Sequence, residues 1–185
     1  RSLTALDARW FESEMDDMKN QLESPAGDLT VRPMLATDVP AMLAFYNDLA
    51  DFVVRTYRPY GYDVTEAKLL EGPAANVASG DELGFVLVDD AGAIWGHAFI
   101  QSIHSPEPQF GVGVHQAVLG RSLGRALTVA VMAEARAKQL PLVNLIVVKD
   151  NKPAWSLYES VGFVVTGQQE GIGGGVANDG LTYLQ

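Results

Sequence analysis

Cysteine is absent from the 185-residue chain, and histidine occurs only at His97, His104 and His115. The lack of cysteine excludes disulfides, thiolate catalysis and cysteine-ligated metals. The three histidines show no ligand spacing such as His-x-x-x-His, so the sequence predicts no metal site. No apolar run reaches the roughly 18 residues that a membrane-spanning helix needs, and no span is predicted.

Positive charge is scarce: 13 lysines and arginines face 23 aspartates and glutamates, for a formal net charge of -10. An acidic surface repels phosphate, so a nucleic-acid partner is disfavoured and cationic ligands are favoured. Residues 1–7 lack the apolar core of a secretory signal peptide. We therefore expect a cytoplasmic protein with neither a membrane nor a nucleic-acid partner.

Length and pattern favour one globular unit with alternating helices and strands. The composition, 48% hydrophobic, allows a sizeable core. The apolar run 141–148 is typical of a central strand covered on both faces. The order predicts a three-layer α/β fold with a mixed sheet. The expected helices are 6–22, 37–53, 65–77, 121–138 and 154–161, and the expected strands are 29–33, 84–88, 93–100, 110–114, 141–148, 163–166 and 181–184.

Turn and cap residues divide these elements. Thr37 and Asp38 are expected to cap a helix with an acidic first turn. The tripeptide 90–92, Asp-Ala-Gly, predicts a hairpin between two strands. Gly162 is expected just after a helix, in the C′ position. Residues 57–62, rich in tyrosine, and the glycine-rich segment 171–175 are expected to be loops, the second of them mobile.

Two segments carry the functional signal. Residues 111–127 predict a strand, a turn of small residues and the start of a helix, where backbone N–H groups at a positive helix end can bind phosphate. Residues 151–163 predict a helix that carries Tyr158 toward the core and ends at a glycine. Together they indicate a protein that binds a phosphorylated cofactor and places a phenol beside it.

These segments resemble the GNAT superfamily of N-acetyltransferases. The family's Gln/Arg-x-x-Gly-x-Gly/Ala signature falls on residues 119–124, where the final glycine is kept, although Leu119 and Ser122 depart from the pattern. The family's second pattern is matched in full by Asn151, Ala154, Tyr158, Gly162 and Phe163. The resemblance implies a GNAT-like acyl-CoA N-acyltransferase domain over residues 29–185, preceded by an N-terminal helical extension over residues 1–28.

The resemblance also implies a binding site for acetyl-CoA as acyl donor. Backbone N–H groups of the 119–124 turn would hold the pyrophosphate, and two arginines would add positive charge. The strand carrying Val112 and Val114 would splay from the next strand, so that the pantetheine arm bonds to backbone groups in the gap. The implied cofactor-binding residues are Val112, Val114, Leu119, Gly120, Arg121, Ser122, Leu123, Gly124, Arg125, Asn151 and Tyr158.

Tyr158 is the predicted catalytic residue. A phenol is protonated at neutral pH and can give its proton to the departing CoA thiolate. The alternative is that Tyr158 is simply one more core aromatic at helical spacing. Likewise, the 119–124 turn could be an ordinary glycine-containing turn flanked by two solvated arginines.

The sequence leaves the acceptor and the general base open. His104, Glu107 and His115 are candidate bases near strand ends. In the resembling family, loops at 57–62 and 168–175 shape the acceptor site, which could take a small amine or a protein α-amino group. The sequence also leaves the oligomeric state open, with a homodimer as one alternative. The competing interpretations are a catalytically silent acyl-CoA-binding module and a structural interaction protein.

Overall fold

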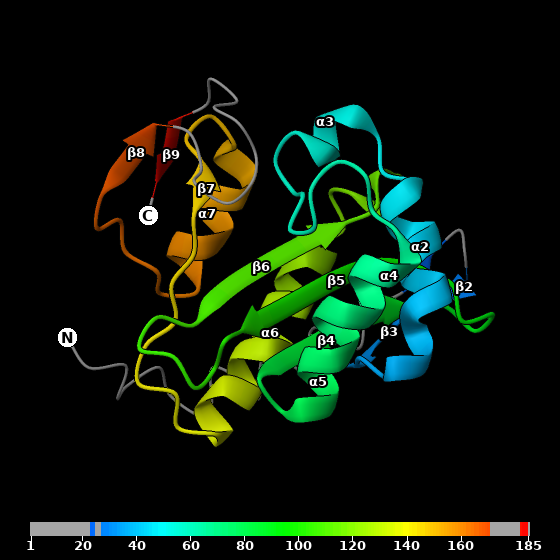
Figure 1. Cartoon of the computed structure of the whole chain (residues 1–185). Helices are drawn as coiled ribbons and strands as arrows, with labels where there is room; N and C mark the ends of the chain where they lie inside the picture. The colour runs from blue at the N-terminus through cyan, green and yellow to red at the C-terminus, as the bar shows by residue number, and fades with distance from the viewer. Residues whose placement is uncertain (1–22, 25–26, 171–181, 185) are drawn as a thin grey trace.

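A computed structural model describes residues 23–24, 27–170 and 182–184. Its centre is an antiparallel sheet in the order β3-β4-β5-β6, formed by β3 (Thr30–Pro33), β4 (Glu82–Val88), β5 (Ile94–Gln101) and β6 (Gln109–Val114) (Figure 1). Two short strands, β1 (Glu23–Ser24) and β2 (Gly27–Asp28), pair with each other ahead of it. The predicted strands 29–33, 84–88, 93–100 and 110–114 are confirmed.

The hairpin between β4 and β5 forms for the predicted reason. Gly92 adopts φ 83°, a left-handed conformation that glycine accepts at no steric cost. Asp89 closes the turn, because its Oδ1 accepts hydrogen bonds from the N–H groups of Ala91 and Ala93, both at 2.9 Å. The resulting register pairs Val86 with His97.

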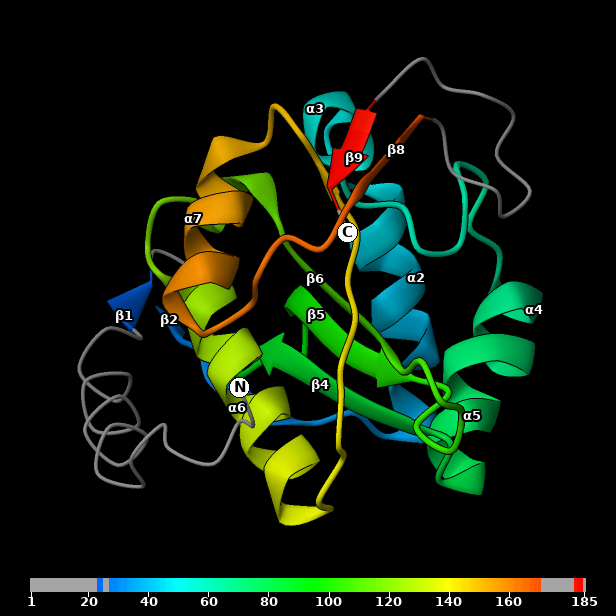
Figure 2. The same cartoon turned by 90° about the vertical axis from the view of Figure 1, so that its left-hand side faces the viewer.

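Helices cover both faces of this sheet, so the predicted three-layer arrangement is confirmed (Figure 2). One face carries α2 (Val39–Asn47), α4 (Glu66–Leu69), the π-helical turn η2 (Leu70–Ala74) and α5 (Ala75–Ser79). The other face carries α6 (Leu123–Ala137), with α7 (Lys152–Ser160) beside it. Short turns η1 (Ala36–Asp38), α3 (Asp51–Val54) and η3 (Gln116–Val118) complete the described helices.

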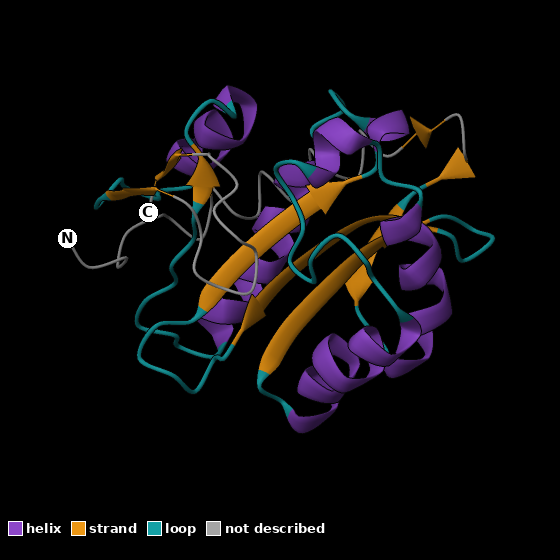
Figure 3. Cartoon of the chain, turned by 45° about the horizontal axis from the view of Figure 1, so that its top comes forward, coloured by secondary structure: helices purple, strands orange, loops and turns teal. Residues whose placement is uncertain are grey.

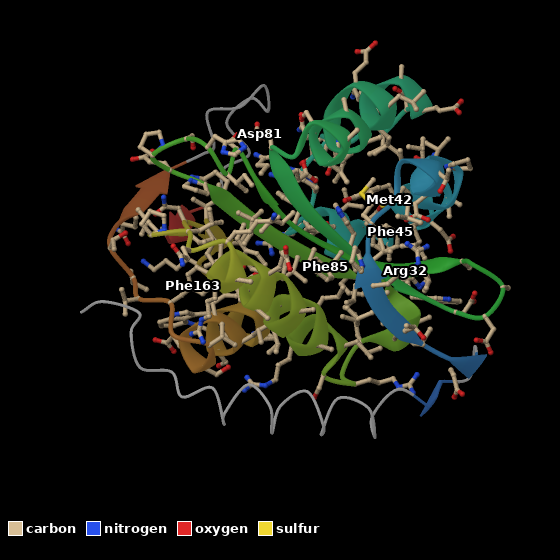
Figure 4. All side chains as sticks on the ribbon, turned by 90° about the horizontal axis from the view of Figure 1, so that it is seen from below. Arg32, Met42, Phe45, Asp81, Phe85 and Phe163 are labelled. Carbon is tan, nitrogen blue, oxygen red and sulfur yellow. The ribbon has the colours of Figure 1, made fainter. Side chains whose placement is uncertain are left out.

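Alternation along β5 sends side chains into two separate cores. Ala98 and Ile100 belong to the core under α6, whereas Phe99 packs in the core under α2. Figure 4 shows Met42 and Phe45 of α2 on that second side. The same alternation places His97, which is fully buried, beneath α2.

Asp38 occupies the N-cap position of α2, as predicted, but its side chain forms no capping hydrogen bond with that helix. Its carboxylate turns back toward β3, where it forms a two-pronged ion pair with Arg32 at 2.7 Å on each oxygen. It also accepts a hydrogen bond from the N–H of Leu35 at 2.8 Å. A neighbouring guanidinium that binds both oxygens competes successfully with a helix N–H for the carboxylate.

The C-terminal part of the chain forms a second sheet in the order β7-β9-β8, from β7 (Val147–Val148), β9 (Thr182–Leu184) and β8 (Gln168–Glu170). The predicted strand 181–184 is confirmed. The prediction of a central strand over 141–148 is wrong, because only the last two residues pair in a ladder. The predicted strand 163–166 is also wrong: Val164 and Val165 are exposed, and pairing starts only at Gln168.

Segment 57–62 is a loop, as predicted, and Gly162 adopts φ 100° directly after α7. The N–H of Phe163 reaches the carbonyl of Tyr158 at 3.0 Å, which completes the predicted glycine cap. The predicted helix 6–22 and loop 171–175 lie outside the described residues. Across the described part of the chain, no helix has the length and apolarity needed to cross a membrane.

Candidate functional site

Strand β6 and the segment that leads into β7 meet at one point and then diverge. Gln109 of β6 forms a parallel bridge with Asn144, and the N–H of Phe110 donates to the carbonyl of Asn144 at 2.7 Å. Beyond this point β7 pairs with β9 instead of β6. Figure 3 shows the smaller sheet set apart from β6. The divergence that the resemblance implied is therefore present.

A cleft of about 880 Å³ occupies the divergence. Residues 110–114 of β6 line one wall, Ile146 and Val147 line another, and α7 and the start of α6 enclose one end. All but one of the residues predicted to bind the cofactor line it together, although they come from three separate segments: Val112, Val114, Leu119, Gly120, Ser122, Leu123, Gly124, Arg125, Asn151 and Tyr158.

Two residues of the turn before α6 have positive φ. Gly120 has φ 77°, and Ser122 has φ 56° and precedes the first helical residue, Leu123. The side chain of Ser122 does not cap the helix. The first-turn N–H groups of a helix have no intrahelical acceptor, so they remain available to a ligand in the cleft.

The two predicted arginines have different surroundings. Arg125 lines the cleft and donates from Nη1 to Ser160 Oγ at 2.7 Å, which ties α6 to α7. Arg121 is not among the cleft residues. Its Nη1 is buried and has no hydrogen-bond partner among the residues that the structure describes. A contact between Arg121 and phosphate stays a prediction.

Tyr158 stands between the cleft and a second cavity. Its ring packs edge-on against Phe110 and Phe163, with centroids 5.9 and 6.0 Å away. The cavity on its other side is apolar, measures about 380 Å³ and is lined also by Leu145 and Trp155. Burial raises the pKa of Tyr158 well above its usual value of 10, so the phenol keeps its proton throughout the neutral range.

Asn151 caps α7 as predicted: its Oδ1 accepts from the N–H of Ala154 at 3.4 Å. The neighbouring Asp150 forms an ion pair with Arg55, with Nη2 and Oδ2 2.8 Å apart. Both partners line the cleft, Arg55 from the end of α3 and Asp150 from the turn before α7. The pair therefore connects two sides of the cleft.

None of the candidate bases named from the sequence lines the cleft. His104 and Glu107 lie exposed in the turn between β5 and β6. His115 is buried, and its Nε2 lies 3.0 Å from Asp48 Oδ2 at the end of α2. Its Nδ1 accepts from the N–H of Ala117. These contacts give His115 a structural role in joining η3 to α2.

The resemblance placed the 57–62 loop at the acceptor site without singling out Tyr57, and Tyr57 forms a wall of the cleft. Its hydroxyl lies 3.0 Å from that of Tyr46 and 3.2 Å from His97 Nδ1. The contacts of its hydroxyl with Tyr46 and His97 join residues far apart in the sequence, and no local pattern indicated them. Tyr60 is partly buried, and the Arg58 guanidinium lies over the exposed ring of Tyr62, 5.1 Å from its centroid.

The described residues contain no group of three or more histidine, aspartate and glutamate side chains placed to hold a metal ion. The cleft lining combines the start of α6, apolar side chains, two phenols and the charged side chains of Arg55, Arg125 and Asp150. Such a surface suits a ligand with a phosphate at one end and a long, mostly uncharged arm.

Comparison with known proteins identifies relatives of this chain. A curated mycothiol acetyltransferase of Thermobispora bispora is 39% identical over 90 residues, which cover 45% of this chain and 30% of that protein. The chain thus spans under a third of the length of this relative.

Solved structures share the fold at low sequence identity. A GNAT-family acetyltransferase of Streptococcus pneumoniae superposes with a TM-score of 0.69 at 19% identity, covering 85% of this chain and 96% of that one. A GNAT phosphinothricin acetyltransferase of Sinorhizobium meliloti, solved with acetyl-CoA, gives 0.68 at 16% identity, covering 84% and 85%. The family model described as "Acetyltransferase (GNAT) domain" matches residues 28–164, and the chain belongs to this family.

Proposed function

We propose that the chain is an N-acetyltransferase that passes the acetyl group of acetyl-CoA directly to a primary amine in a ternary complex. The observation that carries the proposal is the single cleft that gathers the 119–125 turn, the outer edge of β6, Asn151 and Tyr158. Membership of the GNAT family supports acetyl-CoA as the donor.

In the proposed reaction the amine nitrogen attacks the thioester carbonyl. A C–N bond forms, the C–S bond breaks, and the amine nitrogen loses a proton to solvent or to a base. Tyr158 donates its proton to the departing sulfur, and solvent returns a proton to the phenolate. The turn at residues 119–125 would hold the pyrophosphate, and the outer edge of β6 would bind the pantetheine arm.

The direct test incubates the protein with acetyl-CoA and a panel of primary amines, including small amines and peptides with a free α-amino group. We expect thiol release that depends on both the protein and the amine. Binding of acetyl-CoA by calorimetry without thiol release from any amine would instead indicate an acyl-CoA-binding module.

The cofactor turn can be tested with Gly124→Val. A β-carbon at Gly124 would lie 3.8 Å from Leu157 Cδ2, an ordinary contact, so the fold should tolerate the change. The branched side chain should nevertheless block close approach of phosphate to the backbone. We expect acetyl-CoA affinity to fall at least tenfold, or about 1.4 kcal/mol. Unchanged affinity by calorimetry in a folded variant would remove this turn from the site.

The preferred acceptor should carry positive charge. The sequence has a formal net charge of -10, which favours encounter with cations. We expect cationic amines to react faster than anionic ones at low salt, with the difference shrinking as added salt screens the surface. Initial rates for amines of matched size at two ionic strengths measure this, and faster reaction of the anionic amines would contradict it.

A further inference from the structure

The ring of Tyr57 is seated directly on the backbone of β6. A β-carbon built at Gly113 would lie 2.1 Å from Tyr57 Cδ1, so only glycine leaves room for the ring. Tyr57 is 8% exposed and contributes to the cleft wall. Because β6 pairs with β5 along residues 109–114, the ring rests on the backbone of the main sheet.

The hydroxyl of Tyr57 is fixed from below. It donates to the carbonyl oxygen of His97 at 3.2 Å and lies 3.0 Å from the hydroxyl of Tyr46. The Tyr46 hydroxyl is itself 2.8 Å from His97 Nδ1. Burial lowers the pKa of His97 to about 3, so the imidazole stays neutral at working pH. The ring of Tyr46 also stacks on that of Tyr57, with centroids 6.0 Å apart.

Tyr57 and Tyr158 border the same cleft from different elements. Burial raises the pKa of Tyr57, so its hydroxyl keeps its proton throughout the neutral range. If Tyr158 donates to the sulfur of the thioester, the acyl group attached to that sulfur lies near this pair. This step rests on the function proposed above.

We propose that Tyr57 determines acyl-group specificity, because its ring forms a fixed wall that admits acetyl and excludes longer acyl chains. A longer acyl chain would have to displace the ring of Tyr57. That ring packs on Gly113, and its hydroxyl is held by Tyr46 and His97. A pocket can discriminate by about 10- to 200-fold between two substrates that differ by a single methylene. Tyr57 is thus a specificity-determining residue.

The experiment compares kcat/KM for acetyl-, propionyl- and butyryl-CoA with one amine. We expect the wild type to prefer acetyl-CoA, and Tyr57→Leu to raise the propionyl-to-acetyl ratio at least tenfold. Tyr57→Phe and Tyr46→Phe keep the rings but remove hydroxyls, so each should raise the ratio by a smaller factor. A wild type that uses butyryl-CoA as well as acetyl-CoA, or an unchanged ratio in folded Tyr57→Leu, would overturn the proposal.

Phe45→Leu is the matched control. Phe45 is a buried aromatic of the same core but lies outside the cleft residues. It should lower stability without moving the ratio, which separates a specific wall from general loosening of the core. A ratio that rises equally in Phe45→Leu would count against Tyr57.

A binding measurement keeps this inference separate from the proposed function. If no amine supports turnover, the proposed function is wrong. Calorimetric Kd values for the three acyl-CoA donors still measure how affinity depends on the length of the acyl group. Tyr57→Leu should then narrow the difference between acetyl- and butyryl-CoA affinity.

A second readout is the free energy of unfolding. Gly113→Ala should destabilise the wild type more than it destabilises Tyr57→Leu, because leucine leaves more room for the new β-carbon than the tyrosine ring does. Equal destabilisation by Gly113→Ala in the wild type and in Tyr57→Leu would contradict the proposed packing of Tyr57 on Gly113.

Discussion

Tyr158→Phe should lower kcat by about 10²- to 10⁴-fold, the usual contribution of a general acid. The substitution removes only the hydroxyl, so the ring contacts with Phe110 and Phe163 remain. Affinity for acetyl-CoA should therefore change far less than kcat. Steady-state kinetics under conditions where chemistry limits the rate, together with calorimetry on the same variant, separate these two effects.

The acidity of the leaving thiol provides an internal control. An acyl donor with a more acidic thiol needs less help, so it should lose less rate in Tyr158→Phe than acetyl-CoA does. Tyr158→Leu, which also removes the ring, should weaken binding as well. Near-normal kcat in Tyr158→Phe would make Tyr158 a packing residue and assign protonation of the thiolate to water.

Glu82→Gln should make the protein more stable than the wild type at pH 8 but not at pH 5. Glu82 is 4% exposed, and Asn76 Nδ2 reaches only its Oε2, at 3.4 Å. Its Oε1 is buried and has no partner among the described residues. Burial, and to a lesser extent the charge of Asp81, raises the pKa of Glu82 from 4.5 to about 7.

The sign follows from proton counting. Between pH 4.5 and 7 the folded protein keeps the Glu82 proton that the unfolded chain has lost, so the contribution of Glu82 to stability falls as pH rises. At about 1.36 kcal/mol per pKa unit, the loss approaches about 3 kcal/mol by pH 8. Urea unfolding of the wild type and of Glu82→Gln at both pH values measures the difference.

The quantity to follow is the difference in free energy of unfolding between wild type and Glu82→Gln. The total stability also depends on His97, whose contribution changes with pH in the opposite direction. Its pKa is lowered from 6.5 to about 3, so the stability that it contributes is lost as pH falls through that range. Glu134→Gln changes a carboxylate on the surface of α6 and is the matched control. A constant gap between wild type and Glu82→Gln across pH would show that Glu82 does not titrate in the folded protein as inferred.

Local signals predicted those parts of the fold that depend on neighbours in sequence. The β4–β5 hairpin followed from two strand patterns around Asp90 and Gly92. The cap of α7 at Asn151 and its end at Gly162 followed from residues within a few positions of each other. The family patterns at 119–124 and 151–163 likewise identified segments that meet in the cleft.

Features that depend on distant partners were not predicted correctly. The apolar run 141–148 has strand propensity, but the divergence from β6 leaves most of it without a ladder partner. Its Leu142, Val143 and Leu145 line the apolar cavity instead. The cluster of Tyr46, Tyr57 and His97 joins positions up to 51 apart, and no periodicity within one segment indicates it. Propensity describes what a segment can form, and tertiary pairing decides what it does form.

The outer edge of β6 also has a consequence for handling the protein. Beyond Phe110 the described residues place no strand against this edge, so part of its backbone faces the cleft. An unpaired edge is a template on which another chain can add a strand, which is a common start of aggregation. A ligand arm that bonds to the edge would mask this template. Occupancy of the cleft and resistance to self-association during concentration and storage are therefore linked through the same row of backbone groups.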